Sequence, residues 1–191
     1  MNFESILTLL FWGVFYIFDS ENCLLYMFLS ATFHESAHIF FYYVFNAKID
    51  KIKILPFGIS ASFSSSANLS YKKENVALYS GPFFNFLLAA FFFVLSKKTR
   101  TEGAEVFILY NFAYFAVNLL PIYPLDGGRI LKNFLLMRLD DEKALKISNT
   151  VTLIFLSFLF IIGIFTTVFY SNISLISVSI YLAVTFFIKP E

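Results

Sequence analysis

The chain has 191 residues, of which 59% are hydrophobic, 21% aromatic and only 14% charged, and its net charge is +1. Soluble domains carry about 25% charged residues, so this composition excludes an ordinary soluble domain and predicts an integral membrane protein. The near-neutral charge gives no indication of a nucleic-acid partner, and the single cysteine, Cys23, excludes an internal disulfide.

Apolar runs that approach the ~20 residues needed to cross a bilayer recur along the whole chain. We predict an all-α polytopic bundle of about six transmembrane helices, forming one domain over residues 1–191. The first run has no basic segment before it and no small-residue cleavage site, so we interpret it as a retained span rather than a signal peptide. The predicted spans are Ile6–Phe18, Cys23–Phe45, Val76–Leu95, Val106–Leu120, Val151–Tyr170 and Ile173–Ile188.

The basic residues predict the orientation of these spans. Eleven Lys and Arg residues lie in the loops around 48–73 and 129–146 and at the C-terminus, whereas three lie at 97–100. Because cytoplasmic loops carry the excess of basic residues, both termini are expected to face the cytoplasm.

The second predicted span contains the motif His34-Glu35-Ser36-Ala37-His38. Two histidines four residues apart project from the same face of a helix, where they can occupy two corners of a zinc site. Glu35, beside the first histidine, can take a proton from a water at the metal. A pair of satisfied core histidines is the alternative, but it leaves unexplained a carboxylate in a membrane span, which costs roughly 2.5–3.5 kcal/mol. The motif therefore favours Zn²⁺.

Two intervening segments carry weaker signals. Residues 51–63 alternate partly and contain a Pro-Phe-Gly break, which is compatible either with a β-hairpin at the membrane surface or with an amphipathic loop. The role of 51–68 therefore stays open. Gly81-Pro82-x-x-Asn85 lies in the third span, where we expect this element to serve mainly in helix packing. Pro82 would kink the helix and free a carbonyl, and Asn85 would form a hydrogen bond across the bundle.

A third zinc ligand is found by elimination. Most other acidic residues lie in loops or at the termini, whereas Asp126 directly follows a span that runs inward beside the histidine span. Pro121 and Pro124 should end that span, and Gly127-Gly128 permits a sharp turn. Irregular backbone at this depth requires a protein-lined or wet cavity, so we favour Asp126 as the ligand over an ordinary loop aspartate.

Taken together, these motifs resemble the site-2 protease family of intramembrane zinc proteases, most closely the stage IV sporulation protein FB branch. The resemblance rests on the His-Glu-x-x-His helix, Leu55-Pro56-Phe57-Gly58, Ser80-Gly81-Pro82 and the segment 118–131, which runs Asn-Leu-Leu-Pro-Ile-Tyr-Pro-Leu-Asp-Gly-Gly-Arg-Ile-Leu. It implies His34, His38 and Asp126 as zinc ligands and Glu35 as the general base. It also implies that Asn118 positions or stabilises the reacting carbonyl.

The resemblance has further implications for partners and location. It implies a membrane-embedded or membrane-tethered protein substrate, such as a sporulation sigma factor precursor, together with inhibitory membrane partners. The location would be a bacterial cell membrane, including the membrane around the forespore. Ser36-Ala37 replaces the family's usual Leu-Gly, and we expect no CBS-type domain in this chain, which ends at Glu191.

Two other functions compete with proteolysis. A metal-ion transporter also places histidine and aspartate within the membrane, but it requires access from both faces, and the sequence contains no second polar relay. A non-catalytic membrane scaffold is the other alternative, and the intact His-Glu-x-x-His motif argues against it.

Overall fold

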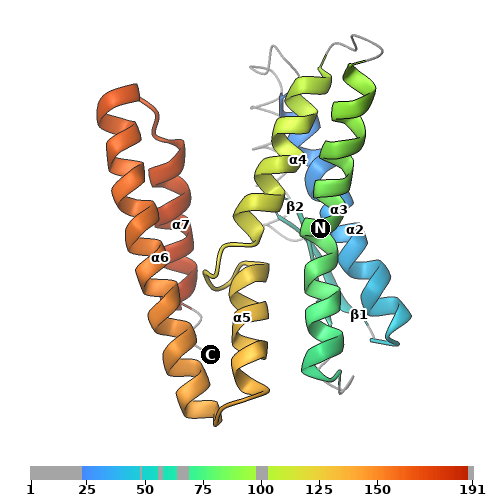
Figure 1. Ribbon diagram of the computed structural model, residues 1–191, viewed down its shortest axis with the longest axis vertical. Helices are drawn as coiled ribbons and strands as arrows, with labels where there is room; N and C mark the ends of the chain where they lie inside the picture. The colour runs from blue at the N-terminus through green and yellow to red at the C-terminus, as the bar shows by residue number, and fades with distance from the viewer. Residues whose placement is uncertain (1–22, 48, 56–57, 64–68, 98–102, 189–191) are drawn as a thin grey trace. The chain divides into compact units, whose positions relative to one another are not determined.

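A computed structural model describes residues 23–47, 49–55, 58–63, 69–97 and 103–188 (Figure 1). The predicted span Ile6–Phe18 lies outside these residues. The chain divides into two compact units, residues 1–117 and 118–191, and each is treated by itself.

The first unit is built on three helices, α2 (Cys23–Val44), α3 (Tyr71–Ser96) and α4 (Ala104–Asn118), the last of which ends on the first residue of the second unit. Helix α2 matches the predicted span closely. Helix α3 begins five residues before the predicted apolar run, because its first turn consists of polar residues with Ser70 as the N-cap. Hydropathy alone marks where the apolar stretch begins, whereas a helix can extend beyond it into the polar region.

Helices α2 and α3 pack against each other through small side chains, and they lie side by side in Figure 1. The buried residues of α2 recur every three or four positions, which defines one helix face. Small residues on α3 let the two backbones approach closely. The buried residues of α2 are Ser30, Ala31, His34, Ala37, His38 and Tyr42, and those of α3 include Ala77, Ser80, Gly81, Asn85 and Ala89.

Between α2 and α3 the backbone forms two antiparallel strands, β1 (Ile49–Leu55) and β2 (Gly58–Phe63). The register pairs Ile49 with Phe63 and Leu55 with Gly58, with an irregularity between Ile49 and Lys51. This two-stranded sheet occupies the segment for which the sequence leaves strand and loop open. The backbone of β2 contacts α2, so the strands belong to the first unit.

The second unit contains α5 (Asp126–Leu136), α6 (Asp141–Tyr170) and α7 (Ser174–Ile188). Helix α5 differs from the sequence prediction, in which Gly127-Gly128 permits a sharp turn in a loop. Both glycines instead lie in the first turn of α5, and a Cβ on Gly127 would come within 2.3 Å of the Leu119 carbonyl oxygen. The glycines are therefore needed for the close approach of the preceding segment, and only the prolines mark an irregular stretch.

Helices α6 and α7 contact each other as a hairpin whose turn begins at Ser171, a residue in the left-handed conformation (Figure 1). Gly163 allows this contact, because a Cβ there would lie 2.9 Å from the Cα of Ile176. The buried core of the unit consists of Ile122, Leu156 and Leu182. Among the described residues, α3 and α6 are long and apolar enough to cross a membrane, and α7 is a shorter apolar helix.

Candidate metal centre

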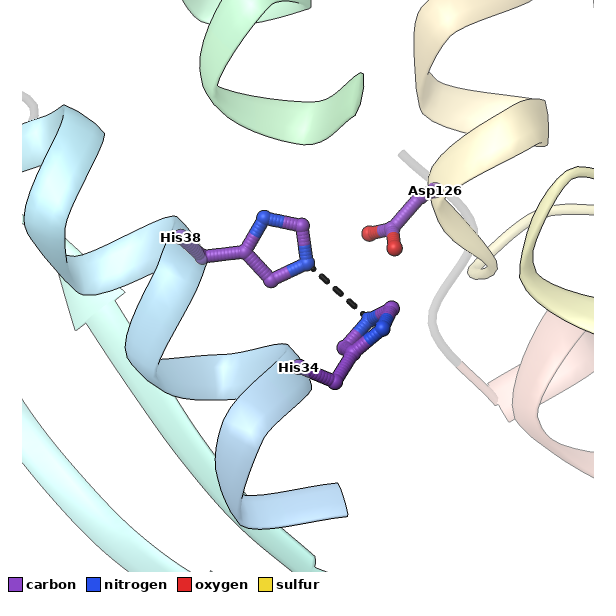
Figure 2. Close-up of side chains that lie close together, drawn as sticks. All are labelled: His34, His38 and Asp126. Atoms are coloured by element: carbon purple, nitrogen blue, oxygen red, sulfur yellow. Dashed lines mark hydrogen bonds between the residues drawn. The ribbon is translucent and has the colours of Figure 1, made fainter. Parts of the chain in front are cut away.

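His34 and His38 occupy the buried face of α2, one turn apart, with exposed fractions of only 4% and 6%. Their ring centroids lie 4.6 Å apart, and the rings are nearly perpendicular. Figure 2 shows the two imidazoles and the contact between them. The helical spacing therefore brings together the pair that the motif predicts.

The tautomer of each ring is set by the group that faces its Nδ1. His34 Nδ1 lies 2.6 Å from Asn85 Oδ1, and His38 Nδ1 lies 2.7 Å from the carbonyl oxygen of Ala77. Both oxygens can only accept, so each Nδ1–H donates. In the neutral rings the lone pair must then be on Nε2, which is the arrangement found in metal-binding histidines.

The two Nε2 atoms lie 3.0 Å apart. Two neutral imidazoles with Nδ1–H bonds would bring two lone pairs together at this distance, so a cation is needed to stabilise the pair. Two imidazole nitrogens on one tetrahedral zinc lie about 3.3 Å apart, given Zn–N bonds of about 2.0–2.1 Å. The pair therefore fits two ligands of one zinc ion. A shared proton would also satisfy the two nitrogens, but it would leave an imidazolium buried between α2 and α3.

Gly81 of α3 packs directly against the two imidazoles. A Cβ at this position would lie 2.3 Å from His38 Nε2 and 2.8 Å from His34 Cε1. Even an alanine would therefore push against both rings. The sequence analysis predicts that the Gly81-Pro82 element serves in packing. In the structure, the residue that packs against the histidine rings is Gly81, which has no side chain.

Glu35 follows His34 on α2 and is half-buried, at the border of the buried face. Tyr114 of α4 approaches the same region, since its ring lies 6.0 Å from that of His34 and its hydroxyl interacts electrostatically with Glu35. The carboxylate thus lies beside the histidine pair but outside its most buried layer.

Asp126 and Asn118 belong to the second unit. Asp126 is the first residue of α5 and only 9% exposed, and its carboxylate is drawn in Figure 2. The positive end of the helix dipole favours the anionic form of a carboxylate at this position, the form that binds metals. The turn before it is fixed by a hydrogen bond from the Tyr123 N–H to Thr152 Oγ1 of α6, 3.2 Å long. Asn118 is half-buried at the end of α4.

Sequence reasoning missed the polar residues that surround His34. Asn85 bonds to the ring itself, which is more than the packing role expected for it. Ser30 and Asn111 are both fully buried and bond to Asn85. Two signals point to them in retrospect: Ser30 lies one turn before His34 on the same helix face, and Asn111 is an amide in the middle of the apolar run of α4.

Comparison with known proteins identifies similar sequences and a similar fold. Residues 95–162 match the model of peptidase family M50. The chain is 30% identical to stage IV sporulation protein FB of Bacillus subtilis over 136 residues, which cover 70% of the chain and 47% of the relative. It is 26% identical to the zinc metalloprotease MJ0392 of Methanocaldococcus jannaschii over 177 residues, which cover 90% and 48%. The chain thus spans about half the length of the curated relatives it matches.

The solved structure of the site-2 protease from Methanocaldococcus jannaschii has the same fold. It matches with a TM-score of 0.68 at 24% identity, over 93% of this chain and 83% of that one. The matched sequence model, the two relatives and this fold agree with the resemblance that the motifs carry. By sequence and by fold, this chain is similar to the site-2 proteases of peptidase family M50.

Proposed function

We propose that the protein is a zinc-dependent intramembrane endopeptidase of the site-2 type. The observation that carries this proposal is the pair of Nε2 atoms 3.0 Å apart, with both Nδ1–H groups already engaged and a carboxylate next in sequence. The name of one relative, a zinc metalloprotease, supports the identity of the metal.

We propose His34, His38 and Asp126 as the three protein ligands. Each is buried and offers one ligand atom, a ring nitrogen or a carboxylate oxygen. Two histidines and one carboxylate, with a fourth position left for water or substrate, form a common ligand set of catalytic zinc. A site built only for structure would fill that fourth position with protein.

The remaining residues have distinct roles in peptide hydrolysis. Bound zinc would supply a Lewis acid that polarises the scissile carbonyl and activates water. Glu35 would accept the proton of the attacking water and pass it to the leaving amine. Asn118 would donate a hydrogen bond from its amide to the carbonyl oxygen as negative charge develops there.

The proposed substrate is a protein embedded in the membrane or tethered to it. A sigma factor precursor, which the resemblance to the sporulation branch implies, is the first substrate to test, and inhibitory membrane partners belong to the same proposal. We further propose that the cut falls near the cytoplasmic face of the membrane. The substrate segment that is cut should unwind easily, because a helical peptide bond is shielded from attack. A cut in the outer half of a substrate span, mapped by mass spectrometry of the products, would contradict this location.

Six membrane spans with both termini in the cytoplasm complete the proposal, and a bacterial membrane, including that around the forespore, is the proposed location. The eleven-to-three distribution of basic residues supports this orientation. Single cysteines at Ser60 and Glu142, introduced in a Cys23→Ser background, should resist an impermeant thiol reagent added to intact cells. Labelling of either position from outside would contradict the orientation.

The direct test of catalysis is Glu35→Gln in the full chain, reconstituted into vesicles with a membrane-tethered substrate. The amide cannot accept a proton, so cleavage should fall by about 10²–10⁴-fold while zinc content stays unchanged. Ser36→Ala, at the adjacent exposed position, is the matched control and should cleave normally. Near wild-type cleavage by Glu35→Gln would exclude Glu35 as the base.

A further inference from the structure

Beyond the proposed ligands, a chain of buried polar groups runs from the backbone of α2 and α4 to the ring of His34. Its side chains are those of Ser30, Asn85 and Asn111, which come from three different helices and have exposed fractions of 0%. Burying three polar side chains between apolar helices is expensive unless every donor has its acceptor.

The directions of these hydrogen bonds follow from backbone carbonyls, which can only accept. The Asn111 amide group donates to the Phe107 carbonyl oxygen (2.9 Å) and to Ser30 Oγ (2.9 Å), so its Oδ1 must be the acceptor. The Ser30 hydroxyl in turn donates to the Tyr26 carbonyl oxygen (2.8 Å). A flipped Asn111 amide would bring two oxygen atoms together at Phe107.

The same constraint passes to the next residue. The Asn85 amide group donates to Asn111 Oδ1 (2.8 Å) and to the Ser30 carbonyl oxygen (3.1 Å). Both of its N–H donors are then used, and its Oδ1 faces His34 Nδ1 at 2.6 Å. The histidine has to donate at this nitrogen, which leaves the lone pair on Nε2.

We propose that Ser30 and Asn111 act through Asn85 as positioning residues, which hold His34 in its Nδ1–H tautomer with the Nε2 lone pair directed to the metal. This inference rests on the proposed zinc site. It adds that metal affinity depends on residues that bond to Asn85 rather than to a metal ligand, and that α4 contributes to the site through Asn111 in addition to Asn118.

The structure supplies a matched pair of serines for the test. Ser30 and Ser179 are both buried, and each hydroxyl donates a hydrogen bond of 2.8 Å to the carbonyl oxygen four residues earlier in its own helix. Only Ser30 also accepts a hydrogen bond from Asn111. Ser30→Ala and Ser179→Ala therefore remove the same group from the same kind of helix, and they differ in the bond to Asn111.

Zinc affinity of the purified full-length variants, measured by competition with a chelator, is the first readout. Ser30→Ala should weaken zinc binding by about 2- to 10-fold, the range of one net hydrogen bond, and Ser179→Ala should not. Asn85→Leu should weaken it by about 10- to 100-fold, as for other groups that orient a ligand. Asn111→Leu, which fills the same volume in an apolar helix, provides an independent variant if Ser30→Ala folds poorly.

The second readout needs no metal. The sequence contains only two histidines, so ¹⁵N NMR of metal-free, histidine-labelled protein resolves both rings. Wild type and Ser179→Ala should have His34 protonated at Nδ1 in its neutral form, whereas Asn111→Leu and Asn85→Leu should give a mixture of tautomers. Equal zinc affinity for Ser30→Ala and Ser179→Ala, or an unchanged tautomer in Asn111→Leu, would overturn the inference. Absence of zinc binding by the wild type would instead overturn the proposed function. The tautomer measurement would still decide whether Ser30 and Asn111 position His34 through Asn85.

Discussion

The α2–α3 pair and the α6–α7 pair are both apolar helix pairs, but they satisfy their polar side chains differently. In α6 and α7, serines and threonines bond back to their own helices, as Ser157, Ser177 and Thr185 do. Across α2 and α3, polar groups bond from one helix to the other, at His34–Asn85 and His38–Ala77. Helix α6 packs against α7 through apolar side chains such as Leu156 and Leu182, and Gly163 allows a close approach. The bonds between α2 and α3 are therefore best understood as orienting the histidines rather than as holding the helices together.

Loss of a histidine should have the largest effect. His34→Ala or His38→Ala removes one of the two Nε2 atoms that we propose as zinc ligands from the first unit. Each purified variant should therefore lose its zinc and its proteolytic activity. Metal content by mass spectrometry, normalised to protein, measures this directly. Full zinc occupancy in both variants would show that the polar contact between α2 and α3 has no metal-binding role.

Asp126→Ala should have the next largest effect, because it removes the third of the ligands that we propose, the one that lies in the second unit. With both histidines intact, the variant should retain weak zinc binding but lose cleavage. Chelator competition and a cleavage assay on the same preparation separate the two effects. Wild-type affinity in this variant would remove Asp126 from the ligand set.

Gly81→Ala and Gly163→Ala compare the two helix pairs with the same chemical change. The added methyl group meets His38 Nε2 at 2.3 Å in one case and the Ile176 Cα at 2.9 Å in the other. Gly81→Ala should therefore reduce zinc affinity by at least about tenfold, as expected when a ligand is displaced. Gly163→Ala should lower the free energy of unfolding by about 1–3 kcal/mol without changing zinc affinity. Equal zinc affinities of Gly81→Ala and Gly163→Ala would show that the α2–α3 contact does not orient the histidines for metal binding.

Thr152→Val should have the smallest effect. It removes the acceptor of the Tyr123 N–H and so loosens the turn before Asp126. We expect a loss of about 1 kcal/mol in the free energy of unfolding, with full recovery in Thr152→Ser, which keeps the hydroxyl. Thermal denaturation in detergent measures both. A Thr152→Val variant as stable as the wild type would show that the hydrogen bond from Tyr123 to α6 does not fix this turn.

The sequence was most informative where one helix carries the pattern. The His-Glu-x-x-His spacing predicts a shared helix face, and α2 has the expected bounds and the two rings in contact. It was less informative about contacts between helices. Asn85 bonds to His34 from 51 residues away, and no local periodicity encodes that distance. Helix α5 is not predicted because Gly127-Gly128 is typical of turns, whereas the structure explains the glycines by close packing, of Gly127 against Leu119 and of Gly128 against Ile122.

The decisive measurement is the zinc content of the purified wild-type protein. We expect one zinc per chain, lost in His34→Ala and retained in Glu35→Gln, because we propose that His34 holds the metal and that Glu35 only moves a proton. A wild-type protein that contains no zinc, and takes up none when zinc is supplied, would rule out the proposed metal site.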